Sequence, residues 1–366
     1  MQQGRLPYTT EEINRLVEQL TPAVSRADAD NERGVAIYGA GFVGTWAARH
    51  LVAQGAKINH FIDRDPLKAG GTIEGIRVVA PTDPAVASNT TVYIAARHVV
   101  REVTEAMSGH GFNLVSLDGY YVVKNYLRLA AVRDTYLGDE RSVETFNALL
   151  YAMLTGTTRS CLDVMEKDMY FSLPQFSGTF DETFVDAGAF VGDTVERFIW
   201  ENMGTFRHIY AFEPGQRQFA ALTHRMQRLA AEWAFPEDSV TMVRAGLASQ
   251  NGSMGFSYLN DSPIRHGLTS DTESGSVEVV TLDGFLDGRA VSFIKADVEG
   301  MEMDLLRGAR ETIRRHRPKM ALCVYHYPSD LHEVAEFVRS LVPEYKFTLR
   351  LHAPLFGDFV LYCHLD

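Results

Sequence analysis

The segment FVDAGAFVGDTVERF, residues 184–198, constrains the fold of this chain more than any other part of its sequence. An apolar run ends in a glycine turn, a helical pattern follows, and the next apolar run, IYAF, ends at Glu213. This order predicts strand, turn, helix and strand, with Gly188 and Gly192 at the turn. In such a unit a ligand lies against bare backbone, and the acid after the second strand can accept the hydroxyl groups of a ribose.

A second glycine turn lies earlier in the chain, in the sequence IYGAGFVG. Its glycines, Gly39, Gly41 and Gly44, have the spacing of a dinucleotide-binding turn. Asp63 follows the last of them by 19 residues, which is the position of a ribose-binding acid. Three interpretations stay open: an NAD(P) site, a site for another nucleotide or a nucleotide-sugar, or a turn with a structural role alone.

Strands and helices alternate around both turns, which predicts the α/β class with two Rossmann-like doubly wound domains. The final runs, YKFTLRL and DFVLYCHL, predict an antiparallel hairpin that closes the second sheet. This pattern resembles the sheet of class I methyltransferases. We predict four segments: an N-terminal helix and polar link over 1–33, a small Rossmann-like domain over 34–119, a helical connector over 120–175, and a methyltransferase-like domain over 176–366.

Composition excludes several classes of partner and site. The formal net charge of −12 argues against nucleic acid and against anionic membranes, because phosphate contacts need a basic surface. The three cysteines, Cys161, Cys323 and Cys363, are far apart and predict neither zinc nor a disulfide framework. A reducing cytoplasm fits this usage, and no apolar run is long enough to cross a bilayer.

The blocks YFSLPQF, FVDAGAFVGDTVERF, IYAFEP, VVTLDGFL and FIKADVEGMEMDLLRGAR stand in one order from Tyr170 onward. In these blocks and their order the chain resembles the FkbM family of S-adenosylmethionine-dependent methyltransferases. The resemblance implies methyl transfer, usually to an oxygen of a sugar or polyketide. It also implies a set of cofactor-binding residues: Tyr170, Asp186, Gly188, Gly192, Asp193, Thr194, Glu213 and Pro214. The segment HFIDRDPLKAGGTIEGIRVVAPTD resembles the N-terminal domains of sugar-modifying enzymes, which face a nucleotide-sugar or a related ligand.

Candidate catalytic residues follow two later strands. Lys295, Asp297 and Glu299 stand in IKADVEG, and His326 ends KMALCVYH. The carboxyl ends of parallel strands meet at one edge of the sheet, so these side chains should lie beside the cofactor. Asp297 and His326 are the expected pair for substrate contact and proton acceptance.

Alternatives remain for each catalytic candidate. Glu299 can instead cap the next helix, Lys295 can form a structural ion pair with Asp297, and His326 can be a satisfied loop histidine. We predict no metal site, although Asp297, Glu299 and His326 are of the types that hold Mg²⁺ or Mn²⁺.

The polar segment 259–276 is a candidate lid or a surface loop. Arg97, after the strand TVYIAA, is a ligand contact or a solvated side chain.

The sequence therefore predicts an S-adenosylmethionine-dependent O-methyltransferase that acts on a hydroxyl of a sugar, a glycan precursor or a natural product. Its partner is a small-molecule or glycan-type acceptor, and a homodimer stays open. The alternatives are an NAD(P)-dependent oxidoreductase that uses the first glycine turn and a non-catalytic protein that binds a metabolite.

Overall fold

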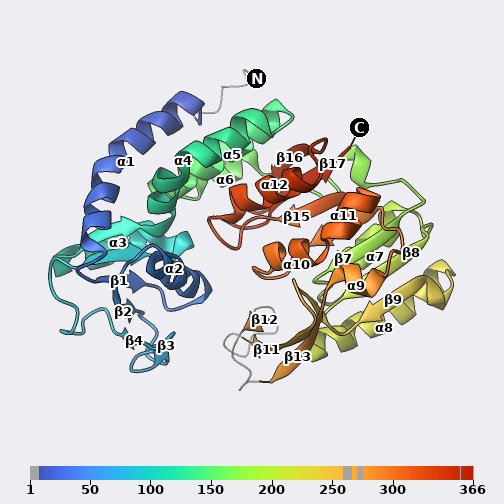
Figure 1. The fold of residues 1–366 in the computed structure, drawn as a ribbon, viewed down its shortest axis with the longest axis horizontal. Helices are drawn as coiled ribbons and strands as arrows, with labels where there is room; N and C mark the ends of the chain where they lie inside the picture. The colour runs from blue at the N-terminus through green and yellow to red at the C-terminus, as the bar shows by residue number, and fades with distance from the viewer. Residues whose placement is uncertain (1–7, 259–265, 270–274, 355, 366) are drawn as a thin grey trace.

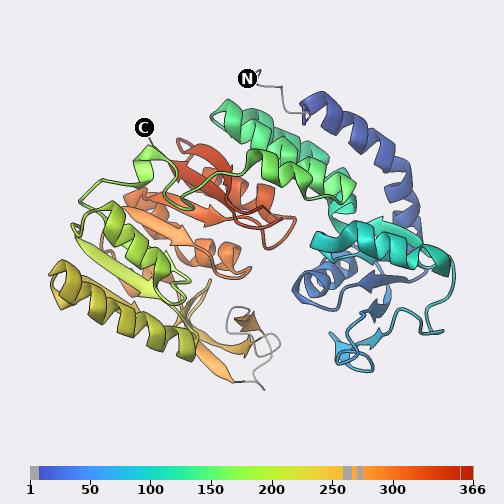
Figure 2. The same ribbon diagram turned by 180° about the vertical axis from the view of Figure 1, so that it is seen from behind.

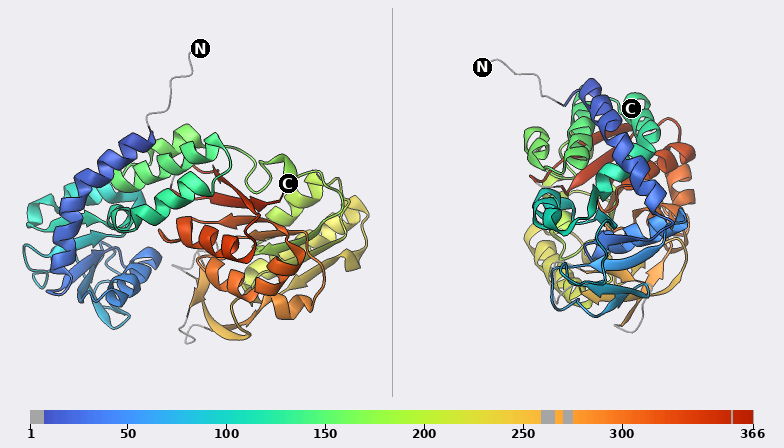
Figure 3. Two further views of the ribbon diagram at one scale, coloured as in Figure 1. Left: turned by 45° about the horizontal axis from the view of Figure 1, so that its top comes forward. Right: turned by 90° about the vertical axis from the view of Figure 1, so that its left-hand side faces the viewer.

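The computed structural model describes residues 8–258, 266–269, 275–354 and 356–365. Two α/β lobes lie side by side, and a layer of helices runs across both of them (Figure 1). The same layer is visible from behind in Figure 2 and from two further directions in Figure 3. Each lobe is built on its own mostly parallel sheet, which confirms the predicted α/β class with two doubly wound units.

The N-terminal lobe has a six-stranded sheet in the order β3-β4-β2-β1-β5-β6. All strands run parallel except β3, which pairs antiparallel with β4. Its elements are β1 (Val35–Tyr38), α2 (Phe42–Ala53), β2 (Ile58–Ile62), β3 (Thr72–Ile73), β4 (Ile76–Val79), β5 (Thr91–Ile94), α3 (Val100–Met107) and β6 (Asn113–Ser116). Every residue of β1 is buried, as expected for a central strand covered on both faces.

The helical layer contains α1 (Thr10–Asp30), α4 (Leu117–Thr135), α5 (Glu140–Thr155) and α6 (Arg159–Val164). Thr9 caps α1, and the helix continues through the segment that we expected to be a polar link. Tertiary contacts explain the extension, because Val24 and Ala27 pack into the core of the N-terminal lobe. The first half of α1 instead packs Ile13 and Val17 into the core beneath the C-terminal sheet, so this helix joins the two lobes.

The C-terminal lobe has a seven-stranded sheet in the order β16-β17-β15-β14-β7-β8-β9. Strand β17 runs antiparallel to both of its neighbours, which confirms the predicted terminal hairpin. The strands are β7 (Thr183–Ala187), β8 (His208–Phe212), β9 (Val240–Val243), β14 (Phe293–Ala296), β15 (Lys319–Cys323), β16 (Lys346–Leu351) and β17 (Phe359–His364). The helices are α7 (Asp193–Glu201), α8 (Gln216–Trp233), α9 (Leu282–Leu286), α10 (Glu302–Gly308), α11 (Arg310–His316) and α12 (Asp330–Leu341).

A small four-stranded sheet that the sequence did not predict lies beside the C-terminal lobe. It consists of β10 (Gly246–Leu247), β11 (Gly252–Tyr258), β12 (His266–Thr269) and β13 (Ser276–Val280). The proposed lid, 259–276, falls largely outside the described residues, but its described part includes β12, paired antiparallel with β11. None of the helices in the described part of the chain is long and apolar enough to cross a membrane.

Candidate active site

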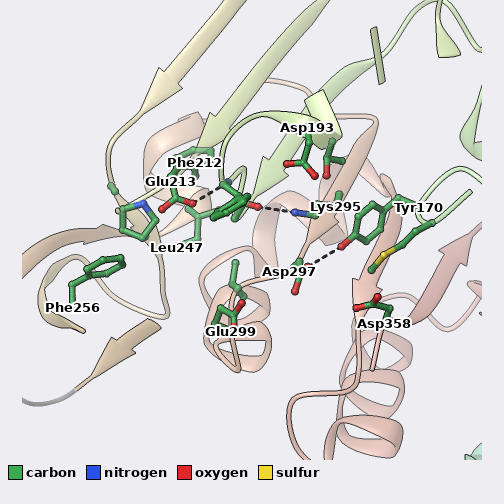
Figure 4. Close-up of a pocket in the computed structure, with 18 residues that line it drawn as sticks. Tyr170, Asp193, Phe212, Glu213, Leu247, Phe256, Lys295, Asp297, Glu299 and Asp358 are labelled. Atoms are coloured by element: carbon green, nitrogen blue, oxygen red, sulfur yellow. Dashed lines mark hydrogen bonds between the residues drawn. The ribbon is translucent and has the colours of Figure 1, made fainter. Parts of the chain in front are cut away.

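A cavity of about 280 Å³ lies at the carboxyl ends of β7, β8 and β14 (Figure 4). Six of the predicted cofactor residues line it: Tyr170, Gly188, Asp193, Thr194, Glu213 and Pro214. Three of the predicted catalytic residues also line it: Lys295, Asp297 and Glu299. The carboxyl ends of neighbouring parallel strands thus bring both sets of residues to one edge of one sheet.

Two glycines give the backbone after β7 its shape. Gly188 has φ +78°, and a Cβ atom there would lie 1.9 Å from the carbonyl oxygen of Asp297. Gly192 has φ +82° and is the N-cap residue of α7, where a Cβ atom would lie 2.7 Å from Leu222. No other residue fits either position without moving its neighbours, so the turn lies directly against the end of β14.

Glu213 follows β8 and is almost completely buried at the cavity wall. Its Oε2 accepts a hydrogen bond from the backbone N–H of Phe190, and its Oε1 accepts one from Gly215. These bonds fix the carboxylate across the glycine turn. Each carboxylate oxygen has a second lone pair, so the group can still accept a hydroxyl of a ligand.

Asp186 and Lys295 form a buried ion pair between β7 and β14. The two residues are paired in register, and Lys295 Nζ lies 3.0 Å from Asp186 Oδ1. The alternative of a Lys295–Asp297 ion pair is therefore wrong, because the lysine pairs across the sheet. Burial raises the pKa of the Asp186 carboxyl to about 6, although the ammonium of Lys295 opposes the shift. Asp186 Oδ2 has no hydrogen-bond partner among the described residues, which leaves a buried acceptor near the turn.

Asp297 is held between two tyrosines. Tyr170 donates to Asp297 Oδ2 over 2.9 Å, and Tyr325 donates to Oδ1 over 3.0 Å. Burial alone would raise the pKa of Asp297, but the charges of Lys295 and His326 and the two tyrosine bonds lower it. Asp297 is thus an ionised carboxylate at the cavity wall at neutral pH.

His326 lies beside Asp297 but is not the proton acceptor that the sequence predicted. Its Nδ1 lies 3.0 Å from Glu302 Oε1, and its Nε2 faces Asp297 and Glu299. Burial lowers the pKa of His326, yet the surrounding carboxylates, Glu302 first, outweigh burial and raise it to about 10. An imidazole with this pKa carries a proton at neutral pH and cannot readily accept another.

Glu299 does not cap a helix. Helix α10 begins at Glu302 with Met301 as its N-cap residue, and Glu302 itself accepts from the N–H of Val298.

Glu302, Tyr325 and Asp358 are site residues that the sequence analysis missed. Tyr325 and Glu302 each stand within a few residues of a predicted candidate, and that proximity was the available signal.

The first glycine turn has a structural explanation. A Cβ atom at Gly44 would lie 1.8 Å from the carbonyl oxygen of Gly39, so helix and turn are in direct contact. Asp63 Oδ2 accepts from Ala40 N–H and from Lys68 Nζ, and its Oδ1 accepts from Asp65 N–H. The acid expected to hold a ribose thus fastens the turn to the next strand, and nothing in the described residues supports a nucleotide there.

The first turn also touches the second lobe. Phe42, directly after Gly41, stacks on Tyr327 with ring centroids 4.8 Å apart. Arg97 is neither a ligand contact nor a solvated residue: its Nε pairs with Asp118 at 2.9 Å and its Nη1 donates to the carbonyl oxygen of Tyr325. The N-terminal lobe therefore holds the segment that carries His326.

Comparisons with known proteins agree with this architecture. Residues 186–349 match the family model described as the methyltransferase FkbM domain. The crystal structure of the methyltransferase FkbM from Methylobacillus flagellatus KT covers 98% of this chain and 100% of its own, with 21% identity and a TM-score of 0.61. A search of curated proteins returned no significant match.

Two further solved structures cover only about half of this chain. An rRNA methylase from Streptococcus thermophilus covers 51% of this chain and 88% of its own, with 14% identity and a TM-score of 0.32. Fibrillarin from Aeropyrum pernix, in complex with S-adenosyl-L-methionine, covers 52% of this chain and 68% of its own, with 12% identity and a TM-score of 0.32. The family model thus matches somewhat less than half of the chain, and the Methylobacillus flagellatus structure shares the fold of the whole chain.

Proposed function

We propose that the protein binds S-adenosylmethionine in the cavity beside Gly188 and transfers a methyl group to a hydroxyl oxygen of a sugar, a glycan precursor or a natural product. When bound, this cofactor supplies a methyl group that its sulfonium already activates. The protein then needs to position the acceptor oxygen and to receive its proton.

Two features of the cavity fit the cofactor. Glu213 offers lone pairs for ribose hydroxyls at the end of β8. The free amides at the start of α7 suit a carboxylate, and Asp193 and Thr194 line the cavity there. Asp186, a predicted cofactor residue, is not among the residues that line the cavity, although its buried Oδ2 has no hydrogen-bond partner among the described residues.

The placement of Asp297 is the observation that supports transfer to oxygen. It is the one carboxylate that lines the cavity and accepts bonds from both Tyr170 and Tyr325. A hydroxyl becomes strongly acidic as its oxygen gains a methyl group, so even a weakly basic carboxylate can take its proton. Burial would raise the pKa of Asp297, but the charges of Lys295 and His326 outweigh burial and keep this carboxylate ionised.

Calorimetric titration with S-adenosylmethionine tests the binding step. Glu213→Gln should weaken binding at least about tenfold, because a buried acceptor is lost, which is about 1.4 kcal/mol. The control Glu278→Gln, an exposed acid on β13, should bind as the unchanged protein does. Absence of saturable binding to the folded protein would refute the proposal.

The acceptor is tested separately, with a panel of hydroxyl and amine compounds and mass spectrometry of the products. We expect methylated hydroxyl products and a lower turnover in Asp297→Asn with cofactor affinity largely kept. Products on amines alone would contradict transfer to oxygen while leaving the cofactor site intact.

A further inference from the structure

The first glycine turn brings an aromatic side chain against the C-terminal lobe. Phe42 begins α2 directly after Gly41, and its ring stacks on Tyr327 with the two planes 15° apart. The same ring lies edge-on to His326, with ring centroids 6.3 Å apart. A residue of the N-terminal lobe therefore packs against the segment that follows β15 and lies beside Asp297.

Phe42 also lies against the turn that carries Glu299. A Cβ atom at Gly300 would lie 2.6 Å from Phe42 Cζ and 2.8 Å from the hydroxyl oxygen of Tyr327. Gly300 is therefore packed against both side chains and has no room for a side chain of its own. Glu299 directly precedes it and lines the cavity. The ring of Phe42 is thus one residue away from the cavity wall.

This turn has a backbone conformation that needs support from its surroundings. Glu299 has φ +53° and Gly300 has φ +89°, so two consecutive residues are left-handed. A non-glycine residue rarely adopts this conformation, which persists only where surrounding contacts enforce it. Glu302 Oε1 holds the start of the turn by accepting from the N–H of Val298. Phe42 and Tyr327 hold its end, at Gly300.

Glu299 lies on the same part of the cavity wall as Asp297. Glu299 Oε2 and Asp297 Oδ1 each lie 3.7 Å from His326 Nε2, and Figure 4 shows both side chains at the cavity. The side chain of Glu299 is 45% exposed, so a molecule in the cavity can reach it. A carboxylate has about four lone-pair sites, so it can accept from a hydroxyl in addition to its contacts within the protein.

We propose that Glu299 binds a hydroxyl group of the acceptor and that Phe42, from the N-terminal lobe, is the positioning residue that holds Glu299 at the cavity. The acceptor role rests on the proposed methyl transfer to oxygen, whereas the packing of Phe42 against Gly300 does not. The first glycine turn then serves the acceptor site, because it starts the helix whose first residue supplies the ring. Gly188 and Glu213 follow other strands, β7 and β8, so loss of Phe42 should leave cofactor binding intact.

Hydrogen exchange of the full chain tests the contact without any acceptor. The N–H groups of Val298 and Met301 form the hydrogen bonds of the turn. In Phe42→Ala their exchange should rise at least about tenfold more than that of β8, which reports global stability. Phe42→Met keeps an apolar side chain of similar length and should restore most of the protection. The matched control is Val52→Ala, an exposed apolar residue of the same helix, which should leave this exchange unchanged.

Steady-state kinetics test the role in acceptor binding, with the hydroxyl compound of the acceptor panel that is methylated fastest. Phe42→Ala and Glu299→Gln should each raise the KM for that compound about tenfold, with the affinity for S-adenosylmethionine unchanged. Because Phe42 acts through Glu299, the double variant should be no worse than Glu299→Gln alone. Effects that multiply in the double variant would overturn the positioning role.

The remaining outcomes separate this proposal from the proposed function. Unchanged exchange at Val298 and Met301 in folded Phe42→Ala would refute the positioning role even if no compound is methylated. An unchanged KM for the panel compound in Glu299→Gln would overturn the assignment of Glu299. Saturable cofactor binding without any methylated hydroxyl product would refute transfer to oxygen and, with it, the acceptor role of Glu299.

Discussion

At the scale of single residues, close backbone contact shapes the site as much as its charged groups do. Gly188 lies so near the carbonyl oxygen of Asp297 that the turn after β7 and the end of β14 form one wall. Glu213 then reaches across this turn to the N–H of Phe190. The position of each charged group therefore depends on residues that have no charge.

Gly188→Ala should lose cofactor binding and unfold more readily. The added Cβ meets backbone at 1.9 Å, and the residue has φ +78°, a conformation that costs a non-glycine residue about 1–3 kcal/mol. Calorimetric titration and urea unfolding measure the two effects. Gly252→Ala is the control, since nothing lies within 4 Å of its added atom. Wild-type affinity in Gly188→Ala would show that the turn does not hold the ligand.

At the scale of elements, the helical connector attaches to the edge strand of the C-terminal sheet. Leu137 forms a bridge to Phe347 and Met165 forms one to Leu351, so β16 is not an open edge. Asp139, the N-cap residue of α5, accepts from Ser142 and pairs with Arg350 of β16. One side chain thus begins a helix and fastens it to the sheet.

Asp139→Ala should lower the free energy of unfolding by about 1 kcal/mol at pH 7, because the cap is lost. Burial raises the pKa of Asp139, but bonds from Ser142 and the charge of Arg350 outweigh burial and lower it from 3.8. A lowered folded pKa stabilises above pH 3.8, and this contribution is lost as the pH falls through the folded value. Urea unfolding between pH 7 and pH 3 should show the difference between the two proteins shrinking. Glu140→Ala removes an acid but no cap bond and should show little of this effect; an equal effect would contradict the capping role.

At the scale of the whole molecule, the two lobes are linked by buried contacts. Helix α1 packs into the cores of both lobes. Arg97 pairs with Asp118, donates to the carbonyl oxygen of Tyr325 and lies 4.1 Å over the ring of Phe356. The N-terminal lobe thus supports the loop that carries His326.

Arg97→Met should destabilise the protein by about 3–5 kcal/mol, because Asp118 is left as an unpaired buried charge. It should also raise hydrogen exchange at residues 324–328 by a larger factor than in β8, whose exchange reports only the loss of global stability. Adding Asp118→Asn should restore part of the stability but not the protection of that segment. Unchanged exchange there would show that Arg97 does not hold the loop.

The sequence could predict those parts that local pattern controls. The unit from β7 through α7 to β8 is continuous in the chain, so the sequence pattern alone predicted that its glycines and Glu213 form a ligand site. The closing hairpin was predicted because its two strands are neighbours. The small sheet of β10 to β13 was missed because its pairing joins separated segments, such as Gly246 with Val279.

The sequence by itself determined which residue types lie at the carboxyl edge of the C-terminal sheet. Local runs of apolar residues define where each strand ends, and the residues that follow lie at this edge. Tertiary structure alone decided their partners. Lys295 pairs with Asp186 rather than Asp297 because of strand register. Three carboxylates around a buried imidazole raise the pKa of His326 and leave its Nε2 facing Asp297 and Glu299. Register and electrostatic environment arise from residues distant in the chain, and no local pattern encodes them.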